Sequence, residues 1–128
     1  IVRLVGSEMC IRDRSNVIAL GTDFPVEDVS PIMTFYSAVA RKDINEYPED
    51  GFQTENALSR LEALIGMTRH GAYANFEENE KGSIEVGKFA DFIILDNDLL
   101  NIQENRIPNT KIVATFVNGE LVFNRRFN

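Results

Sequence analysis

The chain of 128 residues has little of what marks several classes of protein. Its only cysteine, Cys10, has no partner within the chain, which excludes an internal disulfide framework and leaves the redox compartment and the localisation open. No apolar run approaches the roughly 18 to 20 residues that a membrane-spanning helix needs, so no span is predicted in this sequence.

Metal ligands and catalytic signatures are equally scarce. The only histidine is His70, whereas a metal site needs three or more converging ligands. The chain has no His-x-His, Cys-x-x-Cys or His-Glu-x-x-His pattern, no serine in a Gly-x-Ser-x-Gly context and no glycine-rich phosphate loop. A complete metal site and a Ser-His-Asp triad are therefore excluded within this sequence.

Basic residues are in the minority. The chain has 13 Lys and Arg residues against 20 Asp and Glu residues, for a formal net charge of −7. Phosphate backbones are bound by clustered Lys and Arg, so this balance argues against a nucleic-acid partner. With 44% hydrophobic and 26% charged residues, the composition is that of an ordinary globular domain rather than of a disordered chain.

The first residues differ from the rest. The chain begins with Ile1, and residues 1–14 show neither a signal-peptide pattern nor a clean amphipathic period. The stretch Leu4 to Arg14 resembles a translated sequencing-adaptor remnant, LVGSEMCIRDR. We therefore predict a non-native leader over residues 1–14, and no function is assigned to Cys10 within it.

Helix signals dominate the first half of the remaining sequence. Ser30 followed by Pro31 predicts an N-cap and a first helical residue, and the helix is expected to run to about Arg41. The polar stretch Lys42 to Gln53 predicts a surface excursion. The apolar residues of this first helix recur at steps of three and four residues, so one face is expected to be buried: Ile32, Phe35, Tyr36 and Val39.

A second helix is predicted after a capping box made by Ser59 and Glu62. It is expected to continue toward Arg69, to bend or break at Gly71, and to be followed by a short helix over Ala72 to Glu77. Its predicted apolar stripe consists of Leu61, Leu64, Ile65 and Thr68.

From Gly82 onward, short β-like runs replace the helical period. Phe92 to Leu95 and Lys111 to Val117 each predict a strand. The Asn118–Gly119 pair is a strong hairpin signal, because a type I′ turn needs positive φ at both central residues, and Glu120 to Phe123 should return antiparallel. Three aspartates bracket the first strand and are expected to bond to nearby backbone rather than to hold a cation: Asp91, Asp96 and Asp98.

Asp23 is the main candidate for chemistry. The apolar run Asn16 to Leu20 suits a strand buried on both faces, and it ends at Gly21, Thr22 and Asp23. In α/β barrels, catalytic residues stand at the carboxyl ends of such strands, although an aspartate in this position is also common in turns and caps. A buried strand needs neighbours that this sequence does not supply, so we predict a truncated domain.

Four blocks of the sequence resemble the end of amidohydrolase family 3, a branch that includes D-aminoacylase-like and N-substituted formamide deformylase-like enzymes. The resemblance covers Asn16 to Phe123. The blocks read VIALGTDFPVEDVSPIMTFYSAVAR, LSRLEALIGMT with AYANFEE, KGSIEVGKFADFIILDNDLL, and KIVATFVNGELVF.

The resemblance implies an α/β fold class: the C-terminal end of a TIM-barrel metal-dependent hydrolase, with part of a small composite β-sandwich. Residues 15–81 would be the end of the barrel and residues 82–128 part of the sandwich. Asn16 to Leu20 would be the eighth barrel strand. Asp23 would be both a metal ligand and the general base, with Zn²⁺, as one or two ions, the default metal and the other ligands upstream.

The activity implied is hydrolysis of non-peptide carbon–nitrogen bonds in a small amide, formamide or cyclic amide by a metal-activated water. The 128 residues by themselves would be inactive. No role is transferred to His70. The competing interpretation is a self-contained α+β binding module in which Asp23 is only a turn residue and the terminal hairpin offers an edge for interaction.

Overall fold

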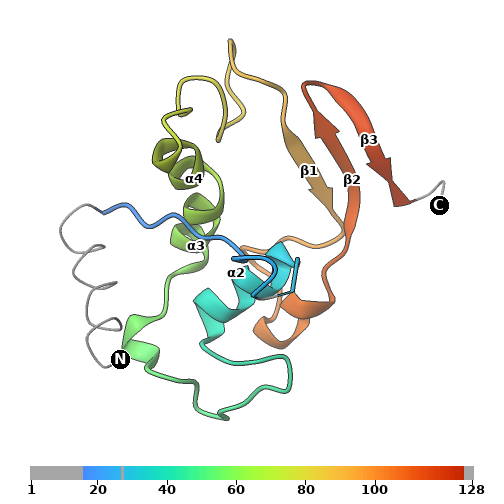
Figure 1. Cartoon of the computed structure of the whole chain (residues 1–128). Coiled ribbons are helices and arrows are strands. Elements are labelled where there is room, and N and C mark those ends of the chain that lie inside the picture. Colours follow the sequence, from blue (N-terminus) through green and yellow to red (C-terminus); the bar gives the residue numbers. More distant parts are fainter. Residues whose placement is uncertain (1–15, 27, 126–128) are drawn as a thin grey trace.

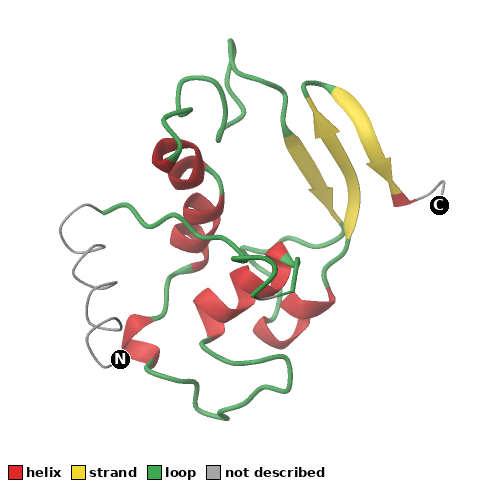
Figure 2. Cartoon of the chain, viewed as in Figure 1, coloured by secondary structure: helices red, strands yellow, loops and turns green. Residues whose placement is uncertain are grey.

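The computed structural model describes residues 16–26 and 28–125, so the predicted leader, residues 1–14, lies outside the described part. The helices gather on one side and a three-stranded sheet stands on the other (Figures 1 and 2). The elements in chain order are α2 (Pro31–Ala40), η1 (Thr54–Asn56), α3 (Arg60–Met67), α4 (Arg69–Ala74), β1 (Phe92–Leu95), η2 (Glu104–Asn109), β2 (Ile112–Val117) and β3 (Glu120–Asn124).

Helix α2 begins and ends as its sequence predicts. Ser30 is the N-cap, and its hydroxyl accepts a hydrogen bond from the Met33 amide at 3.4 Å, with Pro31 as the first helical residue. Arg41 closes the helix in a left-handed conformation, with φ of 56°. The predicted face is confirmed: Ile32, Phe35 and Tyr36 are buried, and Val39 is partly buried against the core.

Helix α3 carries the predicted capping box. The Glu62 amide donates to the Ser59 hydroxyl at 3.3 Å, and the Ser59 amide donates to the Glu62 carboxylate at 2.8 Å. The predicted apolar stripe is wrong at its edges, because Leu61 and Thr68 are exposed. The small residues of the helix are the buried ones, Ala63 and Gly66, because they allow neighbouring segments to approach closely.

The break between α3 and α4 falls at Thr68, and the prediction of a break at Gly71 is wrong. Thr68 has φ of −118° and ψ of −84°, and its hydroxyl donates to the Leu64 carbonyl at 2.8 Å. Gly71 lies inside α4, where a glycine costs only about 1 kcal/mol relative to alanine and does not end a helix by itself.

The sheet has the order β1-β2-β3 and both pairs are antiparallel. The predicted hairpin of β2 and β3 is confirmed, and the pairing of β1 with β2 is seen only in the structure. Asn118 and Gly119 take φ of 51° and 80°, the positive values that the hairpin turn requires. On one face, the rings of Phe92 and Phe116 stack with centroids 4.5 Å apart.

The core joins the helices to the connection between β1 and β2. Leu99 and Ile107 pack with α2 and α3, and the Arg60 guanidinium donates to the carbonyl of Leu99 at 3.0 Å and to that of Ile102. The buried cluster contains Ile32, Phe35, Tyr36, Ala40, Ala63, Leu99 and Ile107. It therefore draws residues from both sides of the predicted boundary at residues 81 and 82, and the boundary stays a prediction.

The run Asn16 to Leu20 forms no strand in the described part of the chain, so that prediction is wrong for this chain by itself. It lies alongside α3 and α4 instead (Figure 1). The sheet that the chain does form stands on the other side of the helices, so no strand is beside this run to complete a ladder. None of the helices that the structure describes combines the length and the apolar character required to cross a bilayer.

Candidate functional site

Asp23 stands in an exposed turn between the run Asn16 to Leu20 and helix α2. The Val26 amide donates to the Asp23 carbonyl at 2.8 Å and closes this turn. Asp23 has φ of 51°, a left-handed conformation that aspartate tolerates better than most residues. The carboxylate is therefore presented to solvent by a defined backbone.

The segment before Asp23 is held against the helix pair α3 and α4. The Leu20 amide donates to the Gly66 carbonyl at 3.0 Å, and His70 Nδ1 lies 3.1 Å from the Ile18 carbonyl oxygen. A Cβ at Gly66 would lie 3.0 Å from that same Ile18 oxygen, a tight contact, so a larger residue at this position would have to push the segment outward. These contacts place the turn that carries Asp23.

No metal centre is assembled by residues 16–26 and 28–125, because no three His, Cys, Asp or Glu side chains converge there. A carboxylate is a suitable oxygen ligand for a divalent cation, and Asp23 is exposed and so able to act as one. This part of the chain therefore contributes one candidate ligand and does not complete a site by itself.

The three aspartates around β1 bond to backbone; the predicted nearby partner is confirmed for Asp98, whereas the partners of Asp91 and Asp96 lie 27 and 15 residues away. Asp91 accepts from the Asn118 amide at 2.7 Å, Asp96 from the Lys111 amide at 2.8 Å, and Asp98 from the Leu100 amide at 2.9 Å. The Lys111 amide is the main cause of the lowered pKa of Asp96, and the Asn101 side-chain amide is the main cause of the lowered pKa of Asp98. Each of these carboxylates thus accepts a backbone hydrogen bond that stabilises the connections around the sheet.

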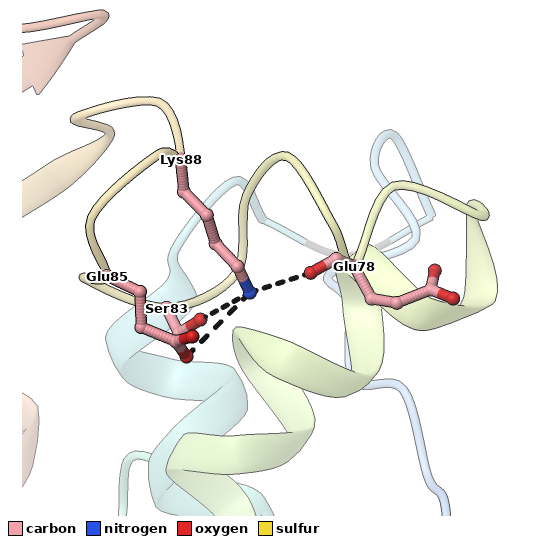
Figure 3. A network of polar contacts seen from close by, with 4 residues as sticks. All are labelled: Glu78, Ser83, Glu85 and Lys88. Carbon is pink, nitrogen blue, oxygen red and sulfur yellow. Dashed lines mark hydrogen bonds and ion pairs between the residues drawn. The ribbon is translucent and has the colours of Figure 1, made fainter.

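Lys88 is a structural residue that the sequence interpretation missed. Figure 3 shows its ammonium pointing into the loop between α4 and β1, where it donates to the Glu78 carbonyl at 2.7 Å and to the Ser83 hydroxyl at 2.8 Å. Glu85 completes the group as an ion pair at 3.8 Å. The Lys88 side chain is only 17% exposed, so it fixes the loop from within. Its place in the block KGSIEVGK was the available signal.

A hollow of about 410 Å³ lies elsewhere, beside α2 and η2, and Asp23 does not line it. Its walls are largely polar. Burial raises the pKa of the Tyr36 phenol, and the negative charge of Glu46 raises it further. The lining residues are Tyr36, Ile44, Asn45, Glu46, Asn105, Pro108 and Asn109.

Comparison with known proteins identifies the family. Residues 11–123 match the sequence profile of the amidohydrolase family. Because this match covers most of the chain, the chain belongs to that family, in the family 3 branch whose blocks its sequence resembles.

Relatives and a solved structure agree with that membership. An N-substituted formamide deformylase of Arthrobacter pascens is 31% identical over 108 residues, which are 84% of this chain and 19% of the deformylase. A 5-methylthioadenosine/S-adenosylhomocysteine deaminase of Caldanaerobacter subterraneus is 32% identical over 123 residues, 85% of this chain and 26% of the deaminase.

The crystal structure of an amidohydrolase from Thermotoga maritima has a similar fold. It superposes with a TM-score of 0.59 at 23% identity, over 85% of this chain and 23% of that one. The chain spans about a fifth of the length of the curated relatives that it matches.

Proposed function

We propose that this chain is the C-terminal part of a metal-dependent amidohydrolase that hydrolyses a non-peptide carbon–nitrogen bond in a small amide, formamide or cyclic amide. The observation that carries the proposal is an exposed carboxylate, Asp23, in a defined turn after an anchored apolar run, in a chain of the amidohydrolase family. The deformylase and the deaminase among its relatives support a carbon–nitrogen bond as the target.

In this proposal Asp23 has two roles, as one ligand of a divalent cation and as the general base. Asp23 would be one of the ligands of a divalent cation, with Zn²⁺ as the default, which when bound would lower the pKa of a coordinated water and polarise the substrate carbonyl. Asp23 accepts the proton of the attacking water and passes it to the leaving nitrogen, which has to be protonated before it departs. Its exposed position is suited to this transfer, because the carboxylate is open to the solvent side of the turn.

The proposed architecture gives the run Asn16 to Leu20 the place of the last barrel strand, with residues 82–125 as part of the neighbouring β-sandwich. Two features support it. The run is apolar but lacks strand neighbours in the described structure. The sheet leaves Ile93 and Val122 exposed by 47% and 59%, which is surface that a second sheet layer would cover.

The decisive experiment uses the complete gene and compares Asp23→Asn with the wild type on a panel of amides, formamides and cyclic amides. We expect kcat to fall by roughly 10² to 10⁴-fold, the usual effect of removing a general base, together with a loss of bound metal measured by mass spectrometry. Asp28→Asn, an exposed aspartate in the same loop, is the matched control and should retain both activity and metal.

Unchanged metal content and unchanged hydrolysis in Asp23→Asn would remove Asp23 from the mechanism and favour the binding-module interpretation. The isolated chain of 128 residues should show no metal-dependent turnover, because it supplies one candidate ligand. Turnover by the isolated chain would contradict the proposed division of the site between this part and the rest of the enzyme.

A further inference from the structure

We propose that Phe24 determines substrate specificity by contacting an apolar group on the nitrogen of the substrate, an inference that rests on the proposed role of Asp23. Phe24 follows Asp23 directly in the chain, and its side chain is 64% exposed. A ring so placed offers a large apolar surface to any molecule that reaches the neighbouring carboxylate.

The turn that presents Phe24 is self-contained. The Val26 amide donates to the Asp23 carbonyl at 2.8 Å, so Phe24 and Pro25 form the tip of a turn that this bond closes. The bond lies beyond the run Asn16 to Leu20 and uses none of the backbone groups with which that run would pair to neighbouring strands. The turn therefore keeps its form whether or not the run is part of a barrel.

The tip of this turn is an apolar surface. Val26, on the other side of Pro25, is 76% exposed, and both Phe24 and Val26 stay outside the buried cluster of the described structure. In the proposed architecture the turn follows the last barrel strand, and the loops after barrel strands build the walls of the active site. The apolar tip therefore belongs to that wall.

The role of Asp23 decides which part of the substrate meets the ring. Asp23 passes a proton to the leaving nitrogen and so stands on the nitrogen side of the bond that breaks. Successive Cα atoms are only about 3.8 Å apart, so the ring of Phe24 begins beside that carboxylate. The substrate class is therefore an amide or formamide whose nitrogen carries an apolar group, which leaves as part of the amine.

The test uses the complete metal-loaded enzyme and two substrates that share one acyl group, chosen as one that the wild type hydrolyses, and carry hexyl or methyl on the nitrogen. We expect the wild type to prefer the N-hexyl substrate in kcat/KM. Phe24→Ala should lower kcat/KM for the N-hexyl substrate by about 10 to 100-fold and for the N-methyl substrate by less than about threefold.

Three further variants control this result. Phe24→Leu keeps an apolar side chain and should hold kcat/KM for the N-hexyl substrate within about threefold of the wild type. Phe24→Gln, which is polar, should lose the preference as alanine does, and it provides the same ratio if Phe24→Ala impairs folding. Phe76→Ala removes an exposed ring that follows α4 and should keep the ratio of the two substrates within about twofold.

An equal loss on both substrates would show that Phe24 packs against the rest of the enzyme, and it would overturn the inference. A wild-type preference for the N-methyl substrate, or hydrolysis only of substrates without a group on the nitrogen, would overturn it as well. Asp23→Asn separates the two proposals. If that variant keeps full activity, the proposed function fails; if it loses activity while Phe24→Ala keeps the wild-type preference, only the role of Phe24 fails.

Discussion

The helical region and the sheet region of this molecule are stabilised in different ways. In the helices, Phe35, Tyr36 and Ala63 are exposed by 0%, 1% and 0%. In the sheet, Ile93 and Leu121 are exposed by 47% and 50%. The helical region is therefore held by the packing of side chains, whereas the sheet depends more on its backbone ladder and on its turns.

The turns of the sheet region are correspondingly rich in specific bonds. The Gly119 amide donates to the Ala90 carbonyl at 3.0 Å, and the Asn118 amide donates to the Asp91 carboxylate at 2.7 Å. Asp96 and Lys111 exchange two bonds at the start of β2. From this difference we expect that truncating a buried side chain lowers the unfolding free energy most in the helical region. Substitutions of turn residues should lower it most in the sheet region.

The largest effect is expected from Phe35→Ala. Its ring is fully buried beneath α2, and removing such a ring costs about 3 to 5 kcal/mol of unfolding free energy. Leu121→Ala, on the half-exposed sheet, should cost less than about 1 kcal/mol. Urea unfolding of the two variants measures the contrast, and equal losses would show that the sheet is packed as tightly as the helices.

A smaller effect is expected at Lys88. Lys88→Met keeps the length of the side chain but leaves the Glu78 carbonyl and the Ser83 hydroxyl without their donor, at a cost of about 1 to 3 kcal/mol. The control is Lys81→Met, whose ammonium forms a more exposed pair with Glu77 at 3.1 Å. Such a pair contributes roughly 0 to 1 kcal/mol, so thermal melting should separate the two variants. A Lys88→Met variant with the stability of the wild type would show that Lys88 does not stabilise the loop.

Two glycines should respond in opposite directions to alanine. Gly119 takes φ of 80° in the hairpin turn, so Gly119→Ala should lower stability by about 1 to 2 kcal/mol. Gly71 lies in α4 with no atom within 4 Å of where a Cβ would be, so Gly71→Ala should raise stability by about 0.5 to 1 kcal/mol. Chemical denaturation measures both signs, and a shared sign would contradict this description of the two regions.

The smallest expected effect is the contribution of Asp96, in the sheet region, to the dependence of stability on pH. The Lys111 amide holds the pKa of Asp96 below its usual value, so the ionised carboxylate stabilises the folded chain above about pH 4. This stabilisation is lost as the pH falls through the pKa of the folded state. Asp96→Asn retains a carbonyl acceptor for Lys111 and should reduce the acid-induced fall of the urea midpoint; parallel curves for variant and wild type would contradict this.

Much of the local structure follows from the sequence because its causes lie within a few residues. Ser30 and Pro31 specify the start of α2, the capping box specifies the start of α3, and the Asn118–Gly119 pair specifies the hairpin. Asp23 was found as a candidate in the same way, from an apolar run that ends in a carboxylate and from its match to the family blocks. These signals need no knowledge of what lies far along the chain.

The tertiary structure decided the features that depend on distant partners. Asn16 to Leu20 has the composition of a strand, but a strand needs a neighbouring ladder, and this run instead meets Gly66 and His70 on the helices. The burial of Leu99 and Ile107 against α2 and the bonds from Arg60 to the carbonyls of Leu99 and Ile102 likewise join residues that no local pattern connects. Local propensity therefore determined where most helices and strands begin, and contacts between separated segments decided which of those segments pack together, because burial and hydrogen-bond pairing are settled only in the folded chain.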